Sequence, residues 1–174
     1  MKVIPLLRIR VLLIAVFVLP LATLADQPER PGKAGIASAH QLATEAGMEI
    51  LRQGGNAFDA AVAVSAALAV VEPSSSGLGG GAFWLLHRAS DGLDTMVDAR
   101  EVAPRAATRD MFLDEKGDVV QGRSTSTALA AGIPGEPAGF EYVSKTYGKL
   151  PFKTVLQPAI RLAREGFPLN DRQA

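Results

Sequence analysis

The side chain with the most specific chemistry in this sequence is Arg100, which lies in the run Asp98-Ala99-Arg100-Glu101. Arginine stays charged at physiological pH and presents five N–H donors in a planar fork. That fork matches the two oxygens of a carboxylate. On residue types alone, a surface ion pair, for example with Glu101, is the more common role for such an arginine, and carboxylate binding is the alternative.

The other polar candidates lack the partners that catalysis or metal binding requires. Residues 74–76 are three serines, but no Gly-x-Ser-x-Gly sequence surrounds them, and neither His40 nor His87 has a recognisable triad partner. The two histidines lack the ligand spacing of a metal site, and the chain has no cysteine. We expect the serines to lie in a turn and four carboxylates to lie on a solvated surface: Asp98, Glu101, Asp114 and Glu115.

A glycine-rich stretch, residues 77–82, formally fits the pattern Gly-x-Gly-x-x-Ala of dinucleotide-binding proteins. That pattern must follow a strand and open a helix, whereas this stretch follows a helical segment and opens a strand-like run. No Lys-Ser or Lys-Thr pair completes a phosphate-binding loop. The sequence predicts instead a tight turn whose glycines let another backbone pack closely.

Two short apolar runs position Arg100. Residues 82–86 and 93–97 are separated by a polar turn at residues 89–92, a pattern that predicts a β-hairpin. Arg100 follows just past the end of the second strand. We therefore expect this hairpin to hold the arginine in place.

Helical patterns lie on both sides of the hairpin. Residues 40–53 place apolar side chains on one face, and two glycines end that helix. Residues 57–71, with Asn56 as N-cap, are apolar around the whole circumference, which predicts a buried helix within a larger body. Weaker patterns predict an extended segment at 35–39, a helical turn and a glycine-centred turn at 111–120, a helix or loop at 124–131, a stiff turn at 132–139, and helices at 140–147 and 151–164.

Composition limits the functions open to this chain of 174 residues. The 18 basic and 18 acidic residues balance, so there is no basic stripe for nucleic acid. Residues 1–25 combine a positive start, an apolar run and small residues before Ala25, which predicts a cleaved signal peptide. Residues 26–34 form a polar linker. The apolar run is shorter than the roughly 20 residues of a spanning helix, so we expect a periplasmic or secreted protein without a stable membrane anchor.

Five stretches, in this order, resemble the gamma-glutamyltransferase (gamma-glutamyl transpeptidase) family. They are Gly54-Gly-Asn-Ala-Phe-Asp-Ala-Ala-Val-Ala, Glu72-Pro with Gly77-Leu-Gly-Gly-Gly-Ala-Phe, Asp98-Ala-Arg-Glu-Val-Ala-Pro, Gly132-Ile-Pro-Gly, and Gln157-Pro-Ala-Ile-Arg-Leu-Ala-Arg-Glu-Gly-Phe. Any one of them alone would be weak, but five at compatible spacing are highly specific. The likeness covers nearly all of residues 35–174.

The resemblance implies the fold and the activity of the whole protein. Members have an α+β fold, the αββα sandwich of N-terminal-nucleophile hydrolases, and we expect an incomplete N-terminal part of it here. They are made as precursors that cut themselves into a large and a small subunit. The new N-terminal threonine attacks gamma-glutamyl amides such as glutathione. The acyl group then passes to water or to an amino-acid or peptide acceptor, and no cofactor is needed.

One functional residue transfers to this sequence. The arginine of the family's Arg-Glu-x-Ala-Pro pattern matches Arg100, and the resemblance implies that it binds the α-carboxylate of the gamma-glutamyl donor. The residue before it is often aromatic or glycine in the family and is Ala99 here.

The family's nucleophile belongs to a Thr-Thr-His pattern. The most similar stretch here is Ser-Thr-Ser-Thr at residues 124–127, and no histidine follows it. We therefore expect residues 35–174 to be the N-terminal portion of a large subunit, with the nucleophilic threonine outside this sequence. Two alternatives remain open. One is a cephalosporin or glutaryl acylase of the same superfamily, and the other is a non-catalytic binding protein.

Overall fold

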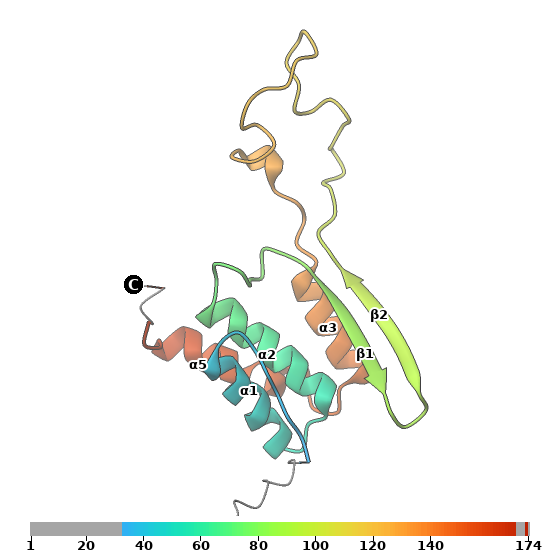
Figure 1. Cartoon of the computed structure of the whole chain (residues 1–174), viewed down its shortest axis with the longest axis vertical. Helices are drawn as coiled ribbons and strands as arrows, with labels where there is room; N and C mark the ends of the chain where they lie inside the picture. Colours follow the sequence, from blue (N-terminus) through green and yellow to red (C-terminus); the bar gives the residue numbers. More distant parts are fainter. Residues whose placement is uncertain (1–32, 170–172, 174) are drawn as a thin grey trace, which may run out of the picture. The chain divides into compact units, whose positions relative to one another are not determined.

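Five α-helices and one antiparallel hairpin form the regular structure of the described residues, 33–169 and 173, in this computed structural model (Figure 1). The chain divides between Gly35 and Ile36, and the description concerns the second unit, residues 36–174. In chain order the elements are α1 Gln41–Arg52, α2 Ala57–Val71, β1 Ala82–Arg88, β2 Leu93–Ala99, the short 3-10 helix η1 Ala128–Ala130, α3 Glu136–Tyr147, α4 Phe152–Val155 and α5 Gln157–Glu165.

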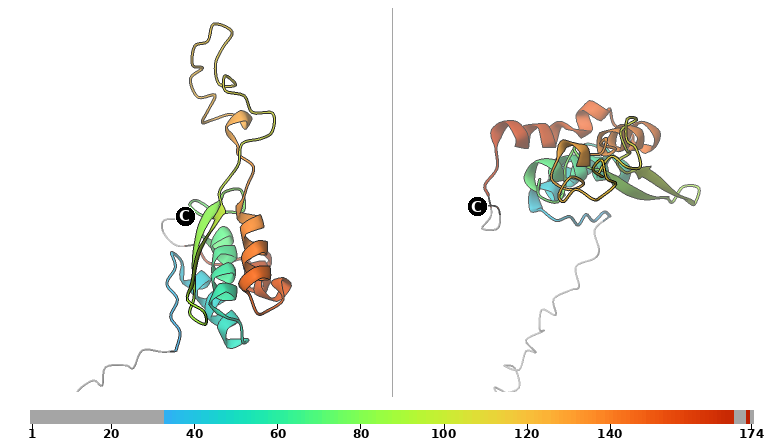
Figure 2. Two further views of the ribbon diagram at one scale, coloured as in Figure 1. Left: turned by 90° about the vertical axis from the view of Figure 1, so that its right-hand side faces the viewer. Right: turned by 90° about the horizontal axis from the view of Figure 1, so that it is seen from above.

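Helix α2 is the centre of the packing, and it has the bounds that the sequence predicts. The Asn56 side chain accepts hydrogen bonds from the backbone N–H groups of Phe58 and Asp59, as an N-cap does. Helices α1, α3 and α5 all pack against α2 (Figure 2). The helix is not buried all round, since Leu68 and Val70 are only partly covered within this chain.

A buried carboxylate joins α2 to the end of α3. Asp59 is fully buried and accepts hydrogen bonds from the backbone N–H groups of Asn56, Lys149 and Leu150. The Asn56 amide donates in turn to the carbonyl of Tyr147. The sequence predicts Asp59 only as a first-turn acid near the positive helix end, so its second role as an anchor for residues 147–150 is a finding of the structure.

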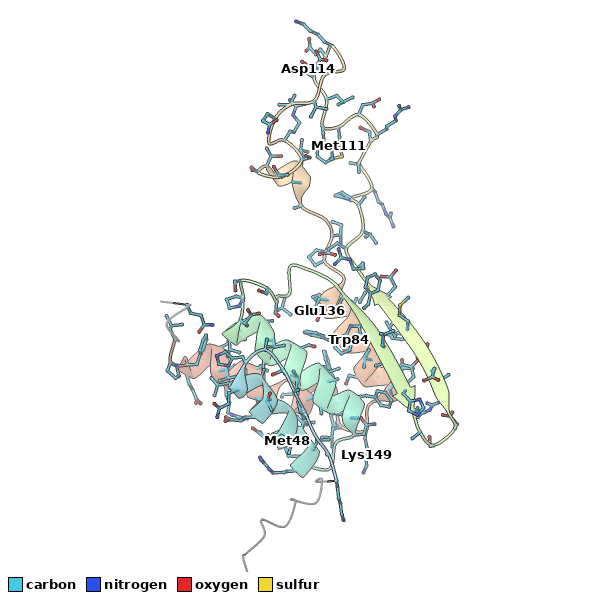
Figure 3. The ribbon with its side chains drawn as sticks, in the orientation of Figure 1. Met48, Trp84, Met111, Asp114, Glu136 and Lys149 are labelled. Atoms are coloured by element: carbon cyan, nitrogen blue, oxygen red, sulfur yellow. The ribbon has the colours of Figure 1, made fainter. Side chains whose placement is uncertain are left out.

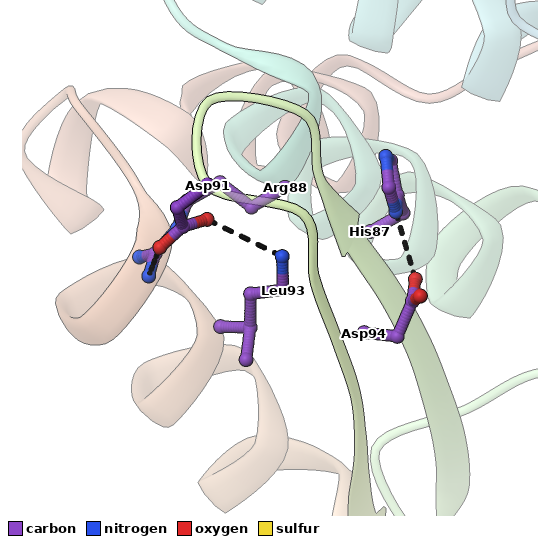
Figure 4. Close-up of polar contacts among 5 residues, drawn as sticks. All are labelled: His87, Arg88, Asp91, Leu93 and Asp94. Atoms are coloured by element: carbon purple, nitrogen blue, oxygen red, sulfur yellow. Dashed lines mark hydrogen bonds and ion pairs between the residues drawn. The ribbon is translucent and has the colours of Figure 1, made fainter.

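The hairpin is confirmed, and each strand is two residues longer than the apolar run that predicts it. Strand β1 pairs with β2 from Ala82 opposite Ala99 to Arg88 opposite Leu93. At the turn, Arg88 binds both oxygens of Asp91, and this hydrogen bonding lowers the pKa of the Asp91 carboxyl (Figure 4).

The two faces of the hairpin differ in burial. The inner face contributes Trp84, Leu86 and Ala99 to the core, and Trp84 meets Phe140 of α3 edge-on at 5.9 Å between ring centroids. The outer face exposes three apolar side chains, Phe83, Leu85 and Met96. These three side chains form an exposed apolar stripe on the two-stranded sheet.

Two helix boundaries differ from the sequence prediction, and proline explains both. Helix α3 begins at Glu136 rather than at 140, because Pro137 falls in its first turn, where a missing N–H does no harm. The predicted stiff turn at 132–139 is therefore wrong for residues 136–139. The predicted helix 151–164 is split into α4 and α5, since Pro158 lacks the N–H that would continue the helical hydrogen-bond pattern.

Residues 103–131, here called the excursion, leave the hairpin and return to α3 as a long loop (Figure 1). An isolated bridge between Val102 and Ile133 closes its base. The glycine-centred turn is confirmed, with the Asp114 carboxylate accepting from the backbone of Lys116 and Asp118. The helical turn predicted before it is absent from the described structure, and residues 35–39, predicted as an extended segment, belong to no strand or helix.

Among the residues described, no helix is both long and apolar enough to cross a membrane. The predicted signal peptide, residues 1–25, lies outside those residues, as does most of the predicted polar linker.

Candidate functional site

Arg100 lies directly after β2, as the sequence predicts. Its backbone N–H donates to the Asp98 carboxylate at 3.0 Å, which fixes the turn out of the strand. About half of its side chain is exposed, and the guanidinium lies 5.9 Å from the centre of the Phe83 ring. One guanidinium nitrogen is 3.3 Å from a carboxylate oxygen of Glu101. The ion pair considered from residue types is therefore present, and an exposed part of the guanidinium remains for a ligand.

Two glycines, Gly81 and Gly135, lie in close contact with the backbone of residues 99–101. A Cβ on Gly81 would lie 2.5 Å from the carbonyl oxygen of Ala99 and 2.7 Å from Cα of Arg100. A Cβ on Gly135 would lie 2.5 Å from the carbonyl oxygen of Arg100. All three distances are far below normal contact, so any side chain there would displace the arginine segment. The predicted close packing of the glycine-rich turn against another backbone is thus confirmed, and that backbone is the one that carries Arg100.

The glycine-rich turn is also hydrogen-bonded to the start of α3. The carbonyl of Gly80 accepts from the backbone N–H groups of Gly135 and Glu136, both at 3.1 Å. Three segments distant in sequence therefore meet at one point: the glycine-rich turn, the residues after β2 and the first turn of α3. This arrangement positions Arg100 from backbone contacts rather than from the conformation of a flexible loop.

An open cleft of about 600 Å³ runs beside this junction. Residues 95–100 of β2 and its extension form one wall, and residues of α3 and the segment before it form the other, including Pro134, Ala138 and Tyr142. Arg100 is part of the lining of this cleft, which is large enough for a small ligand.

The other sequence candidates do not converge on the cleft. Ser75 and Ser76 lie in the predicted turn, where their N–H groups donate to the carbonyl of Glu72. Among the residues described, the ring of His40 caps α1 and the ring of His87 pairs with Asp94 on the hairpin surface, and neither ring is hydrogen-bonded to a hydroxyl (Figure 4). Those residues also include no group of three or more acidic or histidine side chains placed to bind a metal ion.

One carboxylate prediction is wrong, and one relevant carboxylate was not predicted. Asp98, Asp114 and Glu115 are exposed as expected, whereas Glu101 is partly buried and its Oε2 atom has almost no contact with solvent. Glu136, at the start of α3, is buried close to the same junction (Figure 3). Its place in the stretch Gly-Glu-Pro could have indicated a helix start, but nothing in the sequence indicates its burial.

Comparison with known proteins identifies the family. The sequence model described as gamma-glutamyltranspeptidase matches residues 43–174. The chain belongs to the gamma-glutamyltranspeptidase family. It is 48% identical over 147 residues to the glutathione hydrolase proenzyme of Escherichia coli, a match that spans 84% of this chain and 25% of that protein. The chain thus spans about a quarter of the length of this curated relative.

Solved structures confirm the fold class. The structure superposes on the gamma-glutamyltranspeptidase of Helicobacter pylori with a TM-score of 0.79 and 46% identity, over 84% of this chain and 42% of that chain. The cephalosporin acylase of Bacillus halodurans is a more distant neighbour, with a TM-score of 0.65 and 30% identity over 84% of this chain and 29% of that chain. The fold is therefore α+β, a partial N-terminal-nucleophile hydrolase unit, and its described residues comprise helices on one face of a two-stranded sheet.

Proposed function

We propose that residues 35–174 are the N-terminal portion of the large subunit of a gamma-glutamyltransferase or glutathione hydrolase. The complete protein would cleave gamma-glutamyl amides such as glutathione and pass the acyl group to water or to an amino-acid or peptide acceptor. In this proposal Arg100 binds the α-carboxylate of the donor. The family membership supports the reaction class, and the lower identity to the acylase favours gamma-glutamyl over other acyl groups.

The observation that carries the proposal is the rigid placement of a half-exposed arginine at the edge of a cleft. A guanidinium binds a carboxylate through two parallel, charge-assisted hydrogen bonds. Glu101 already balances the charge of Arg100, but at 3.3 Å it makes no hydrogen bond to it. A donor carboxylate can therefore take the N–H donors that Glu101 leaves unused.

The outer face of the hairpin supports a second part of the proposal, an association with a small subunit from the same precursor. Phe83, Leu85 and Met96 are each more than half exposed. Phe83 also lies next to Arg100, so protein that covers this face would adjoin the arginine. Such a partner would cover the apolar stripe and bring its own residues to the donor.

The proposal predicts a sharp difference between this chain and the complete protein. Binding a donor does not split an amide bond without an activated nucleophile. We expect the purified chain to give no turnover of a chromogenic gamma-glutamyl anilide, and the processed complete protein to be active. Turnover by the pure chain would show that it holds its own nucleophile. An inactive, correctly processed complete protein would contradict the proposed reaction.

We further propose that the protein is exported to the periplasm or secreted, with cleavage after Ala25. The positive start, apolar run and small residues before that position support this proposal. Intact-mass analysis of the exported protein should give a chain that begins at Asp26. A mature species that still carries residues 1–24 would indicate an uncleaved anchor instead.

A further inference from the structure

A buried acid lies at the start of α3, close to the arginine site. Glu136 is only 9% exposed, and its Oε2 atom has no hydrogen-bond partner among the described residues (Figure 3). A buried acceptor without a donor is rare, because it loses its bonds to water and gains none in return. An ionised carboxylate would suffer this loss far more strongly than a neutral acid.

A second carboxylate, Glu101, lies beside Arg100, and its charge acts on Glu136. Oε2 of Glu101 is also buried without a hydrogen bond, and it is the atom that lies 3.3 Å from the Arg100 guanidinium. The hydrogen bonds from the backbone of Gly135 and Glu136 to Gly80 fix the start of α3 against the glycine-rich turn. A Cβ on Gly80 would lie 3.6 Å from the other oxygen of Glu101, so the same turn also covers this carboxylate.

No cationic side chain among the described residues forms an ion pair with Glu136. The glycine-rich turn has no charged residue. On the hairpin, Arg88 is paired with Asp91 and His87 with Asp94, while Asp98 accepts from the backbone of Arg100. On α3 itself Lys145 is paired with Glu141, and the buried indole N–H of Trp84 makes no hydrogen bond among the described residues. Two acidic residues belong to α2 or its cap, and both are engaged elsewhere: Glu72 accepts from Ser76, and Asp59 binds the backbone beyond the far end of α3. Arg100 is paired with Glu101. Burial, and after it the charge of Glu101, raise the pKa of Glu136.

We propose that Glu136, in its neutral form, is a positioning residue for Arg100 and acts on the arginine through Glu101. With Glu136 protonated, the charges of Glu101 and Arg100 balance each other, and the guanidinium can bind a further carboxylate. With Glu136 ionised, a second negative charge adds to that of Glu101 near the site and repels the incoming carboxylate of the donor. This inference rests on the proposed role of Arg100 in donor binding.

The direction of the pH dependence follows from this arrangement. At low pH Glu136 is neutral and the donor binds at full strength. As the pH rises through the raised pKa of Glu136, a negative charge appears near the site and the donor KM should increase. One additional partly buried charge close to the donor carboxylate should raise KM about tenfold between the two limits.

The test compares donor KM across pH for the processed complete protein, its Glu136→Gln variant and a matched control, Glu141→Gln. Glutamine keeps the shape of a neutral acid and cannot ionise. We expect Glu136→Gln to retain the low KM and lose the alkaline increase, while Glu141→Gln, on the exposed side of α3, should keep the wild-type profile. A donor analogue without the α-carboxylate should show little of this increase in the wild-type protein, because it lacks the negative charge that Glu136 would repel.

The possible outcomes separate this inference from the proposed function. An active protein in which Glu136→Gln keeps the wild-type increase in KM would overturn the role of Glu136 and leave the reaction intact. A protein without gamma-glutamyl activity would overturn the proposed function itself. If the variant fails to fold, the wild-type profile still decides: equal pH dependence of KM for the donor and its analogue would contradict the inference.

Discussion

Replacing Arg100 with alanine in the complete protein should lower donor kcat/KM by about ten- to a hundredfold or more. Each charge-assisted hydrogen bond to the donor carboxylate contributes roughly 1.5–3 kcal/mol, and about 1.4 kcal/mol corresponds to a factor of ten. Arg100→Lys should recover only part of the activity, because an ammonium group cannot bind both carboxylate oxygens in one plane. Steady-state kinetics with a chromogenic gamma-glutamyl donor measure both variants.

A donor analogue without the α-carboxylate provides the control for this prediction. If Arg100 binds that group, the loss caused by Arg100→Ala should be much smaller for the analogue, which makes the comparison a double-mutant cycle across protein and ligand. Arg109→Ala is a matched control, since Arg109 is almost fully exposed in the excursion. Equal losses for the two donors would show that Arg100 has a structural role through its contact with Glu101.

The position of Arg100 could be predicted from sequence because local patterns determine it. Two apolar runs and a polar turn specify the hairpin, and the strand end then fixes where residue 100 lies. The glycine-rich turn was also interpretable, since a helix before it and a strand after it excluded a nucleotide site. Which backbone the glycines approach was not predictable, because residues 81, 99–101 and 135 meet only through long-range packing.

Burial of acidic side chains was the main feature that the sequence did not indicate. Local patterns assign a lone glutamate or aspartate to the surface, where such residues usually lie. Glu101, Glu136 and Asp59 are instead covered by segments far from them in the chain. The helix boundaries at two prolines were also predicted wrongly. Pro137 and Pro158 each lack a backbone N–H, and this determines where α3 and α5 begin. A pattern of apolar residues does not detect that effect.

Asp59→Ala should destabilise the protein more than any other substitution named here. The carboxylate is fully buried and accepts from the backbone N–H groups of Asn56 and Lys149 at 3.0 and 2.9 Å, with a longer bond from Leu150. Alanine would leave these donors buried without an acceptor and would remove half of the capping box of α2. We expect the free energy of unfolding to fall by about 3–5 kcal/mol.

Denaturant unfolding of the complete protein measures this loss, and two further variants locate its cause. Asp59→Asn keeps one carbonyl acceptor but adds an amide that faces N–H donors, so it should lose about 1–3 kcal/mol. Asp94→Ala removes an exposed carboxylate from the hairpin surface and should change stability by no more than about 0.5 kcal/mol.

A loss below about 1 kcal/mol for Asp59→Ala would mean that water or a shifted backbone satisfies the freed N–H groups. In that case Asp59 would not be the anchor between α2 and the end of α3. Because Gly135, which contacts the backbone of Arg100, directly precedes α3, a large loss would link the stability of this junction to the arginine site.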